Sequence, residues 1–240
     1  MSVYSTVKRI YKFLVPKRVR RSFFLLMPLP LKRLRHRLIG ILEKTAEHNE
    51  IYDVDYYNEL VDEYMANSSG AIAESIIEVF SPKSVVDVGC GTGQLLLAVK
   101  EHGISCEGLE YSKAAVDICQ RRGLKVTRFD LEHDKVPPNL RADVAISTEV
   151  AEHIPEVCAD HFVDVLCTIA GTVIMTAAEP SPTGFGTDHV NEQPNEYWIR
   201  KFQTRGYAYN ERISHQCRIE WSEKKVEAFY VSTVMVFERT

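Results

Sequence analysis

The sequence predicts an α/β protein whose β-sheet is mostly parallel and is covered by helices on both faces. Short apolar segments alternate with segments of helical periodicity, and the chain closes on strand-like segments. One apolar segment, Val85–Val88, runs directly into the glycine-rich turn at 89–93. Strand–turn–helix units of this kind hold nucleotide-like ligands in doubly wound folds. With 240 residues, 45% of them apolar, we expect one catalytic domain over residues 51–240, preceded by an extension over 1–50.

The elements follow from apolar periodicity and from capping residues. Ser112 has the character of a helix N-cap, and Gly103 and Gly123 are placed to end helices. Predicted helices cover residues 70–80, 94–102, 112–122, 158–170 and 195–204. Predicted strands cover 85–88, 105–110, 125–129, 142–147, 172–177, a segment near 207–213, and 229–237. A turn over 149–155 and a long loop over 178–194 separate the later elements.

The extension differs from the body in charge. Residues 1–50 carry twelve Lys or Arg and three Glu, whereas the other 190 residues sum to about −13. The apolar run 23–27 is too short to span a bilayer. We expect residues 1–45 to form a basic, amphipathic arm that contacts an anionic membrane surface; an active-site lid or an oligomer contact is the alternative. The acidic body disfavours nucleic acid as a partner.

Cysteine usage indicates the compartment. The six cysteines form no Cys-x-x-Cys pair, and several fall inside predicted strands or helices, which is typical of reduced thiols. The prediction is therefore a cytoplasmic protein with peripheral contact at the inner membrane face. The sequence does not indicate an oligomeric state.

Acidic residues at the ends of successive strands accompany the glycine turn. Gly89, Gly91 and Gly93 allow positive φ and close approach of a ligand, Glu110 can accept both hydroxyls of a ribose, and Asp130 follows the third strand, where an adenine edge would lie. A nicotinamide dehydrogenase has a similar turn. However, the spacing is Gly-x-Gly-x-Gly, and Asp87 suits an ammonium better than a pyrophosphate.

These residues resemble the class I methyltransferases that use S-adenosylmethionine. The resemblance rests on Val-Val-Asp-Val-Gly-Cys-Gly-Thr-Gly at 85–93, on Glu110 and Asp130, and on Ser-Thr-Glu-Val-Ala-Glu-His-Ile-Pro at 147–155. It implies a Rossmann-like sheet of seven strands with the last one antiparallel. It also implies that S-adenosylmethionine is bound by Asp87, Gly89, Gly91, Gly93, Glu110 and Asp130, with Gln94 and Tyr57 as further neighbours.

A second polar cluster follows the fourth strand. Glu149, Glu152 and His153 would share one face of a helical turn, and His189 lies in the loop after the fifth strand. Two carboxylates and two imidazoles would suit a divalent ion such as Mg²⁺. Methyltransferases of small-RNA 3′ ends and of quinone-ring hydroxyls look similar here. The alternatives are a metal-free site with His153 or His189 as general base, or a site that only orients the acceptor. The catalytic candidates are therefore His153, His189 and Glu149.

The predicted reaction is methyl transfer to an oxygen, on a hydroxyl of a sugar or glycan intermediate of polysaccharide biosynthesis. The segment 188–198 resembles loops of bacterial methyltransferases near such pathways, and Tyr197 and Trp198 could offer a sugar an apolar face or pack between helix and sheet. A basic arm would suit a lipid-linked acceptor. The alternatives are a quinone-like or phenolic small molecule, an RNA 3′ end, and a non-catalytic cofactor-binding protein.

Overall fold

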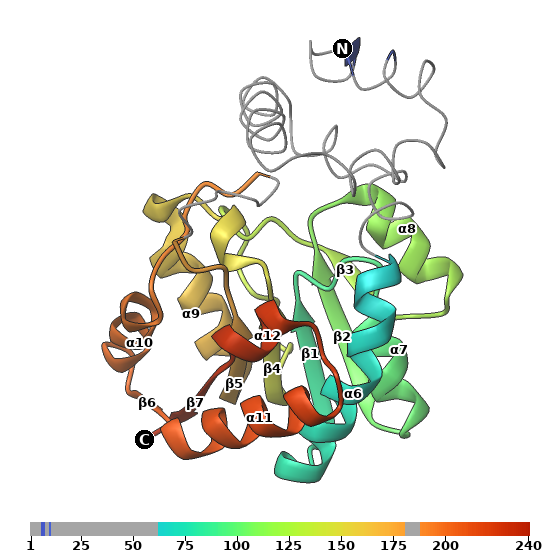
Figure 1. Cartoon of the computed structure of the whole chain (residues 1–240). Helices are drawn as coiled ribbons and strands as arrows, with labels where there is room; N and C mark the ends of the chain where they lie inside the picture. The colour runs from blue at the N-terminus through green and yellow to red at the C-terminus, as the bar shows by residue number, and fades with distance from the viewer. Residues whose placement is uncertain (1–5, 8–9, 11–61, 181–187) are drawn as a thin grey trace.

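The computed structural model describes residues 6, 7, 10, 62–180 and 188–240 (Figure 1). Most of the predicted 1–50 extension lies outside these residues, as does Tyr57. The expectations for the basic arm and for Tyr57 as a cofactor neighbour therefore stay predictions.

The described residues form a seven-stranded sheet in the order β3-β2-β1-β4-β5-β7-β6. All neighbouring strands pair in parallel except β7, which is antiparallel to both β5 and β6. The strands are β1 (Ser84–Val88), β2 (Ser105–Glu110), β3 (Val126–Arg128), β4 (Ala142–Thr148), β5 (Ala170–Thr176), β6 (Tyr207–Tyr209) and β7 (Met235–Arg239). This confirms the predicted Rossmann-like sheet and its antiparallel last strand.

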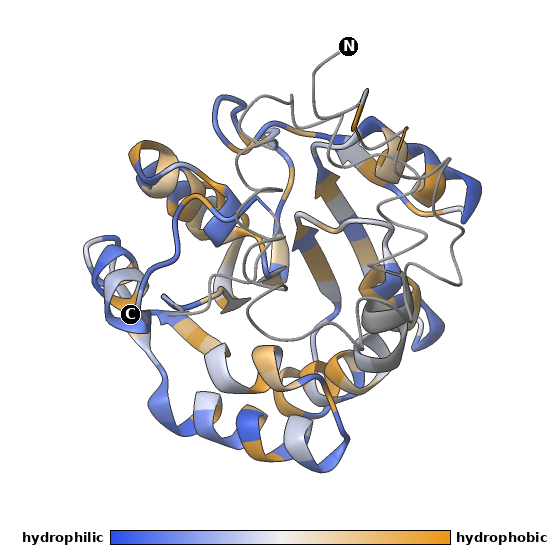
Figure 2. Ribbon diagram, turned by 45° about the horizontal axis from the view of Figure 1, so that its top comes forward, coloured by the Kyte–Doolittle hydropathy of each residue, from blue (hydrophilic) through white to orange (hydrophobic). Residues whose placement is uncertain are grey.

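Helices cover both faces of the sheet (Figure 1). They are α6 (Asp62–Phe80), α7 (Gln94–Glu101), α8 (Lys113–Arg121), α9 (Ala159–Ile169), α10 (Asn195–Gln203), α11 (Glu211–Glu223) and α12 (Ala228–Thr233), with 3₁₀ turns η2 (Ala151–His153) and η3 (Glu156–Cys158). The helices carry both hydrophobic and hydrophilic residues (Figure 2). Within the described residues, no helix combines the length and the apolar content needed to cross a membrane.

Alternating strand residues supply two cores on opposite faces of the sheet. Val86 and Val88 of β1 point into the core made with α9 and α10, whereas Val85 points into the core made with α6, α7 and α11. Both faces of β1 are buried, because a parallel central strand is covered by helices on each side. The cores fix the sheet and leave the carboxyl ends of the strands to carry the site.

The predictions near the C-terminus were partly wrong. The strand expected near 207–213 ends at Tyr209, and α11 occupies the segment that follows. Asn210 caps α11 by accepting the Ile213 N–H at 3.0 Å, and Ile213, Cys217 and Trp221 are buried along one face at a spacing of four residues. Polar residues between them hid this period. Likewise, α12 forms from the first half of the strand expected over 229–237.

Candidate functional site

The glycine turn connects β1 to α7 and is bound to the end of β2. The backbone N–H groups of Gly89 and Cys90 both donate to the Leu109 carbonyl, at 2.8 and 3.1 Å. All three glycines have positive φ, between 52° and 79°. A Cβ on Gly89 would lie 2.4 Å from Val150 Cγ2, and one on Gly93 would lie 2.4 Å from Leu124 Cδ1. At Gly89 and Gly93 the protein's own packing therefore leaves no room for a side chain, whatever space a ligand also needs.

Glu110 and Asp87 place two buried acids beside this turn. Glu110 ends β2 and accepts the backbone N–H groups of Gly91 and Ser112, at 2.8 and 2.7 Å. Burial raises the pKa of the Glu110 carboxyl, and these N–H donors oppose the rise. Burial, and secondarily the charge of Glu110, raises the pKa of Asp87 to about 8. Such a site favours a cationic ligand, and S-adenosylmethionine fits because it carries an ammonium and a sulfonium.

Asp130 lies at the end of the neighbouring strand β3, as predicted. Its side chain caps its own turn, because Oδ1 accepts the Glu132 N–H at 2.9 Å and Oδ2 lies 3.1 Å from His133 Nδ1. Gln94 begins α7 directly after the turn. The structure thus brings the predicted strand-end residues to one edge of the sheet, and the adenine and methionine roles stay predictions.

The loop after β4 holds the second predicted cluster, but not on one regular helical turn. Glu149 has a left-handed backbone (φ 54°), and its N–H lies 3.1 Å from Thr176 Oγ1, next to β5. Glu152 follows in η2 and is completely buried. Its carbonyl accepts the N–H groups of Val190 and Asn191, at 2.9 and 3.0 Å. These bonds attach the loop that carries His189 to the loop that carries Glu152.

Glu152, His153 and His189 form a group that could hold a metal ion, with one ligand atom from each lying within 4.8 Å of the others. The two imidazole rings meet edge to face with centroids 4.9 Å apart, and His189 Nε2 lies 4.0 Å from Glu152 Oε1. We name these three residues the EHH group. Glu149 lies beside the group, outside its three members.

The carboxylate of Glu152 is the most unusual part of the EHH group. Neither of its oxygens has a hydrogen bond of good geometry among the described residues, although the backbone N–H groups of Glu152 and Ala178 and the carboxyl of Glu149 are near enough to influence it. Burial, and then the neighbouring charge of Glu149, holds the pKa of Glu152 well above its usual range. Burial also raises the pKa of Glu149 to about 7. Two adjacent buried carboxyls of this kind require a proton or a cation, since buried charges are normally paired.

Both histidines direct Nδ1 at an oxygen that can only accept a hydrogen bond. His153 Nδ1 lies 3.1 Å from the Asp188 carbonyl, and His189 Nδ1 lies 2.8 Å from Glu192 Oε1. Nδ1 therefore carries the hydrogen in each ring, and in the neutral form the lone pair is on Nε2. Metal-binding histidines are usually held in this way. The sequence prediction missed Asp188 and Glu192, although the spacing His189-x-x-Glu192 was a usable signal.

Trp198 does not belong to the site. Its side chain is fully buried and packs against Phe162 and Tyr197, with ring centroids 6.1 and 5.0 Å away. The Tyr197 ring lies 4.8 Å from Lys201 Nζ. The suggested sugar-facing role of Trp198 is therefore wrong, and the packing alternative holds.

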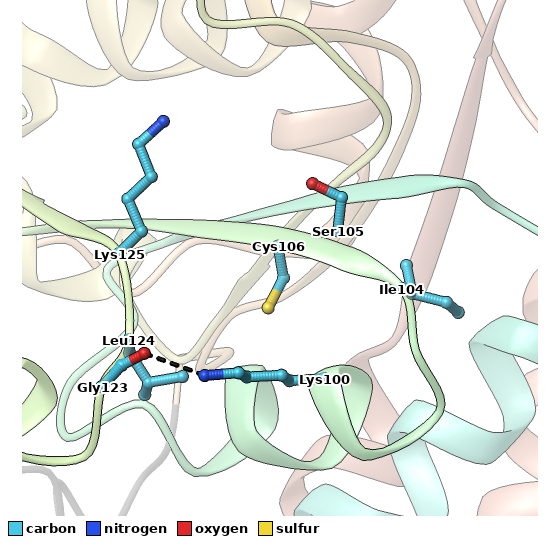
Figure 3. A pocket seen from close by; sticks show the side chains of 7 residues that line it. All are labelled: Lys100, Ile104, Ser105, Cys106, Gly123, Leu124 and Lys125. Atoms are coloured by element: carbon cyan, nitrogen blue, oxygen red, sulfur yellow. Dashed lines mark hydrogen bonds between the residues drawn. The ribbon is translucent and has the colours of Figure 1, made fainter.

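A pocket of about 230 Å³ lies elsewhere, beside the amino-terminal end of β2 (Figure 3). Lys100, Cys106 and Lys125 are among its lining residues, and Lys100 Nζ donates to the Gly123 carbonyl at 2.9 Å. Since β2 begins at Ser105 in this pocket and ends at Glu110 in the glycine site, the two places lie at opposite ends of the strand.

Comparisons with known proteins agree on the family. A family model described as a methyltransferase domain matches residues 31–215, so the match begins inside the predicted extension. A search of curated proteins found no significant match.

Solved structures support the fold at low sequence identity. The CcbJ methyltransferase of Streptomyces caelestis has a TM-score of 0.57 and 11% identity, over 78% of this chain and 96% of that one. An S-adenosylmethionine-dependent methyltransferase of Archaeoglobus fulgidus has a TM-score of 0.55 and 17% identity, over 77% of this chain and 100% of that one. The methyltransferase domain of the bacterial protein CtHen1-C has a TM-score of 0.52 and 18% identity, over 72% of this chain and 97% of that one. With its family match and strand order, the chain belongs to the S-adenosylmethionine-dependent methyltransferases.

Proposed function

We propose that this methyltransferase transfers its methyl group to an oxygen, on a hydroxyl of a sugar or glycan intermediate bound at the EHH group. The observation that carries the proposal is that the loop after β4, which bears Glu152 and His153, packs against the glycine turn through Val150. Val150, two residues before Glu152, fills the space that a Gly89 side chain would need. An acceptor at the EHH group would therefore lie beside the methyl donor.

Removing the acceptor's proton is the chemical task that a hydroxyl acceptor sets. A neutral hydroxyl must lose its proton during methylation, and a nearby base or cation assists. When bound, S-adenosylmethionine supplies an electrophilic methyl on a sulfonium. The chain would hold the donor with Glu110 and the glycine turn, and would place an imidazole nitrogen near the acceptor oxygen.

A divalent ion fits the EHH group, and the two imidazoles beside one carboxylate favour a first-row transition-metal ion over Mg²⁺. Glu152, His153 and His189 would hold it, and the buried carboxylate without a well-formed hydrogen bond supports this assignment. A bound ion lowers the pKa of a coordinated hydroxyl and positions its oxygen. In the metal-free alternative, the Nε2 of His153 or His189 accepts the proton directly.

The ion favours an acceptor with neighbouring oxygens. Three protein ligands leave coordination positions open, and vicinal hydroxyls of a sugar can fill two of them. A phenolic acceptor with adjacent hydroxyls is the alternative within small molecules. The charge of about −13 on residues 51–240 disfavours an RNA 3′ end, which would bring many phosphates.

The test is methyl transfer from labelled S-adenosylmethionine to a panel of lipid-linked glycans, free sugars, nucleotide sugars, catechols and short RNAs, with and without chelator. We expect label in a glycan or sugar fraction, loss of transfer with chelator, and recovery with Mg²⁺ or Mn²⁺. Label in catechols or RNA alone would contradict the sugar proposal. Full transfer in chelator would leave the histidine-base alternative.

The basic arm extends this proposal to the membrane. We propose that residues 1–45 hold the protein at an anionic cytoplasmic membrane surface, where a lipid-linked acceptor would be found. Deleting residues 1–45 should abolish co-sedimentation with phosphatidylglycerol vesicles and preserve S-adenosylmethionine binding. Loss of cofactor binding in the deletion would instead support the lid alternative.

A further inference from the structure

The two histidines of the EHH group differ in what holds their Nδ1 hydrogen. His153 donates to a backbone carbonyl, that of Asp188, which has a left-handed backbone (φ 56°). His189 donates to a side chain, the carboxylate of Glu192, at 2.8 Å. Both side chains of this second pair are about one-fifth exposed, at 18% and 21%. A substitution can therefore remove the acceptor of His189 while that of His153 remains.

The Glu192 bond determines which nitrogen of His189 faces the EHH group. A carboxylate accepts the Nδ1 hydrogen, so the lone pair of a neutral ring is on Nε2. His189 Nε2 lies 4.0 Å from Glu152 Oε1, too far for a hydrogen bond. Two ligand bonds of about 2.1 Å to one ion can span this gap.

Hydrogen bonds that do not involve the Glu192 side chain also hold the surrounding loop. The N–H groups of Val190 and Asn191 donate to the Glu152 carbonyl, and Gln193 Nε2 donates to the Oδ1 of Asn191 at 2.9 Å. Asn191 itself is buried. Replacing Glu192 should thus leave these bonds in place and remove the carboxylate that accepts the Nδ1 hydrogen of His189.

We propose that Glu192 is a positioning residue that fixes the Nδ1–H tautomer of His189 and thereby presents Nε2 to the acceptor site. The role of Nε2 as a metal ligand or base rests on the proposed function, whereas the tautomer itself does not. Glutamine is the matched variant because its amide oxygen can accept the same hydrogen without the charge.

Nuclear magnetic resonance of ¹⁵N-histidine-labelled protein at alkaline pH measures the tautomer directly. In the unsubstituted protein we expect an Nδ1–H pattern for His189, which Glu192→Gln keeps and Glu192→Ala loses. His153 is the internal control and should keep its pattern in both variants. An unchanged His189 tautomer in Glu192→Ala, or its loss in both variants, would overturn the proposal.

Titration with Mn²⁺ alone provides the second readout. We expect Glu192→Ala to weaken Mn²⁺ binding about 10- to 100-fold, as loss of such an outer partner usually does. Glu192→Gln should weaken it less, and S-adenosylmethionine affinity should be unchanged in both. A locked tautomer in a protein that binds no Mn²⁺ would refute the metal and sustain the positioning role, so the two failures are distinguishable.

Discussion

The two halves of the site differ in how a buried glutamate is stabilised. Glu110, in the glycine-turn half, ends β2 and accepts two backbone N–H groups at 2.8 and 2.7 Å. Glu152, in the EHH half, is more deeply buried, and neither of its oxygens has a well-formed hydrogen bond among the described residues. The first carboxylate is thus stabilised by the fold itself, whereas the second depends on a proton or a cation.

This difference teaches which part of the site is preorganised. N–H donors from the turn and from the start of α8 hold Glu110 before any ligand arrives. The EHH group instead keeps a buried carboxyl whose pKa is raised by burial and by Glu149, and carboxyls perturbed in this way are typical of functional sites. Substitutions should therefore weaken binding in one half and relieve strain in the other.

The largest expected effect is on turnover, from Glu152→Gln. The amide would remove the only carboxylate of the EHH group and reduce methyl transfer about 10³-fold or more, the order of effect seen when a main electrostatic contact is lost. It should also raise the melting temperature of the metal-free protein, because it removes a buried, poorly paired acid. Activity assays and thermal melts measure both effects.

The matched control for this variant is Glu156→Gln, an exposed acid on the adjacent turn η3. It should change neither turnover nor stability. Normal turnover in Glu152→Gln would end the assignment of the EHH group to the acceptor side.

Next in size is the effect of Glu110→Ala on S-adenosylmethionine affinity. Loss of the carboxylate removes the contact that we predict with the ribose, and it leaves the Gly91 and Ser112 N–H groups without their acceptor. We expect at least about 100-fold weaker binding by calorimetry, or about 2.7 kcal/mol. Glu107→Ala, on the same strand and paired with Lys125 at the surface, should bind normally.

Gly93→Ala should destabilise the fold by about 2–3 kcal/mol in urea unfolding, because positive φ combines with a 2.4 Å clash on Leu124. Gly103→Ala is the matched control. It has nearly the same φ, 75° against 77°, and nothing within 4 Å of the added Cβ. We expect it to cost about 1 kcal/mol. Equal costs would show that backbone strain alone explains both glycines.

The smallest effect concerns pH. The pKa of Asp87 is raised from 3.8 to about 8, so the folded protein binds its proton more tightly than the unfolded chain does between these values. Stability contributed by the protonated group is therefore lost as pH rises through that window. As pH rises through this window, the melting temperature of the ligand-free protein should fall by a few degrees less in Asp87→Asn than in the unsubstituted protein. The surface variant Asp117→Asn, which loses a bond to Lys113, should not.

The strand and helix pattern made most of the fold predictable, since β1, β4 and β5 carry apolar runs, and Gly103 and Gly123 mark the ends of the helices that precede β2 and β3. Polar helices were the weak point. In α11 the buried residues Ile213, Cys217 and Trp221 are separated mostly by polar and charged residues, so the segment had no visible apolar run. In α12 the β-branched residues Val231 and Thr233 favoured a strand, and tertiary packing overrode that preference.

Within the site, strand ends were predictable and side-chain partners were not. The positions of Glu110 and Asp130 follow from topology, because the carboxyl ends of parallel strands meet at one edge. The position of Glu149 beside the EHH group, and not on one regular helical turn with it, depends on a left-handed backbone that periodicity does not reveal. The Glu192 contact depends on how the loop from 188 to 192 attaches to Glu152.

Calorimetry of two ligands on three proteins tests the contrast between the halves most directly. The unsubstituted protein, Glu110→Ala and Glu152→Gln would each be titrated with S-adenosylmethionine and with Mn²⁺. We predict that Glu110→Ala loses S-adenosylmethionine affinity and keeps Mn²⁺, and that Glu152→Gln does the reverse. Loss of both affinities in either variant, or no Mn²⁺ binding to the unsubstituted protein, would contradict a site built from one preorganised half and one cation-dependent half.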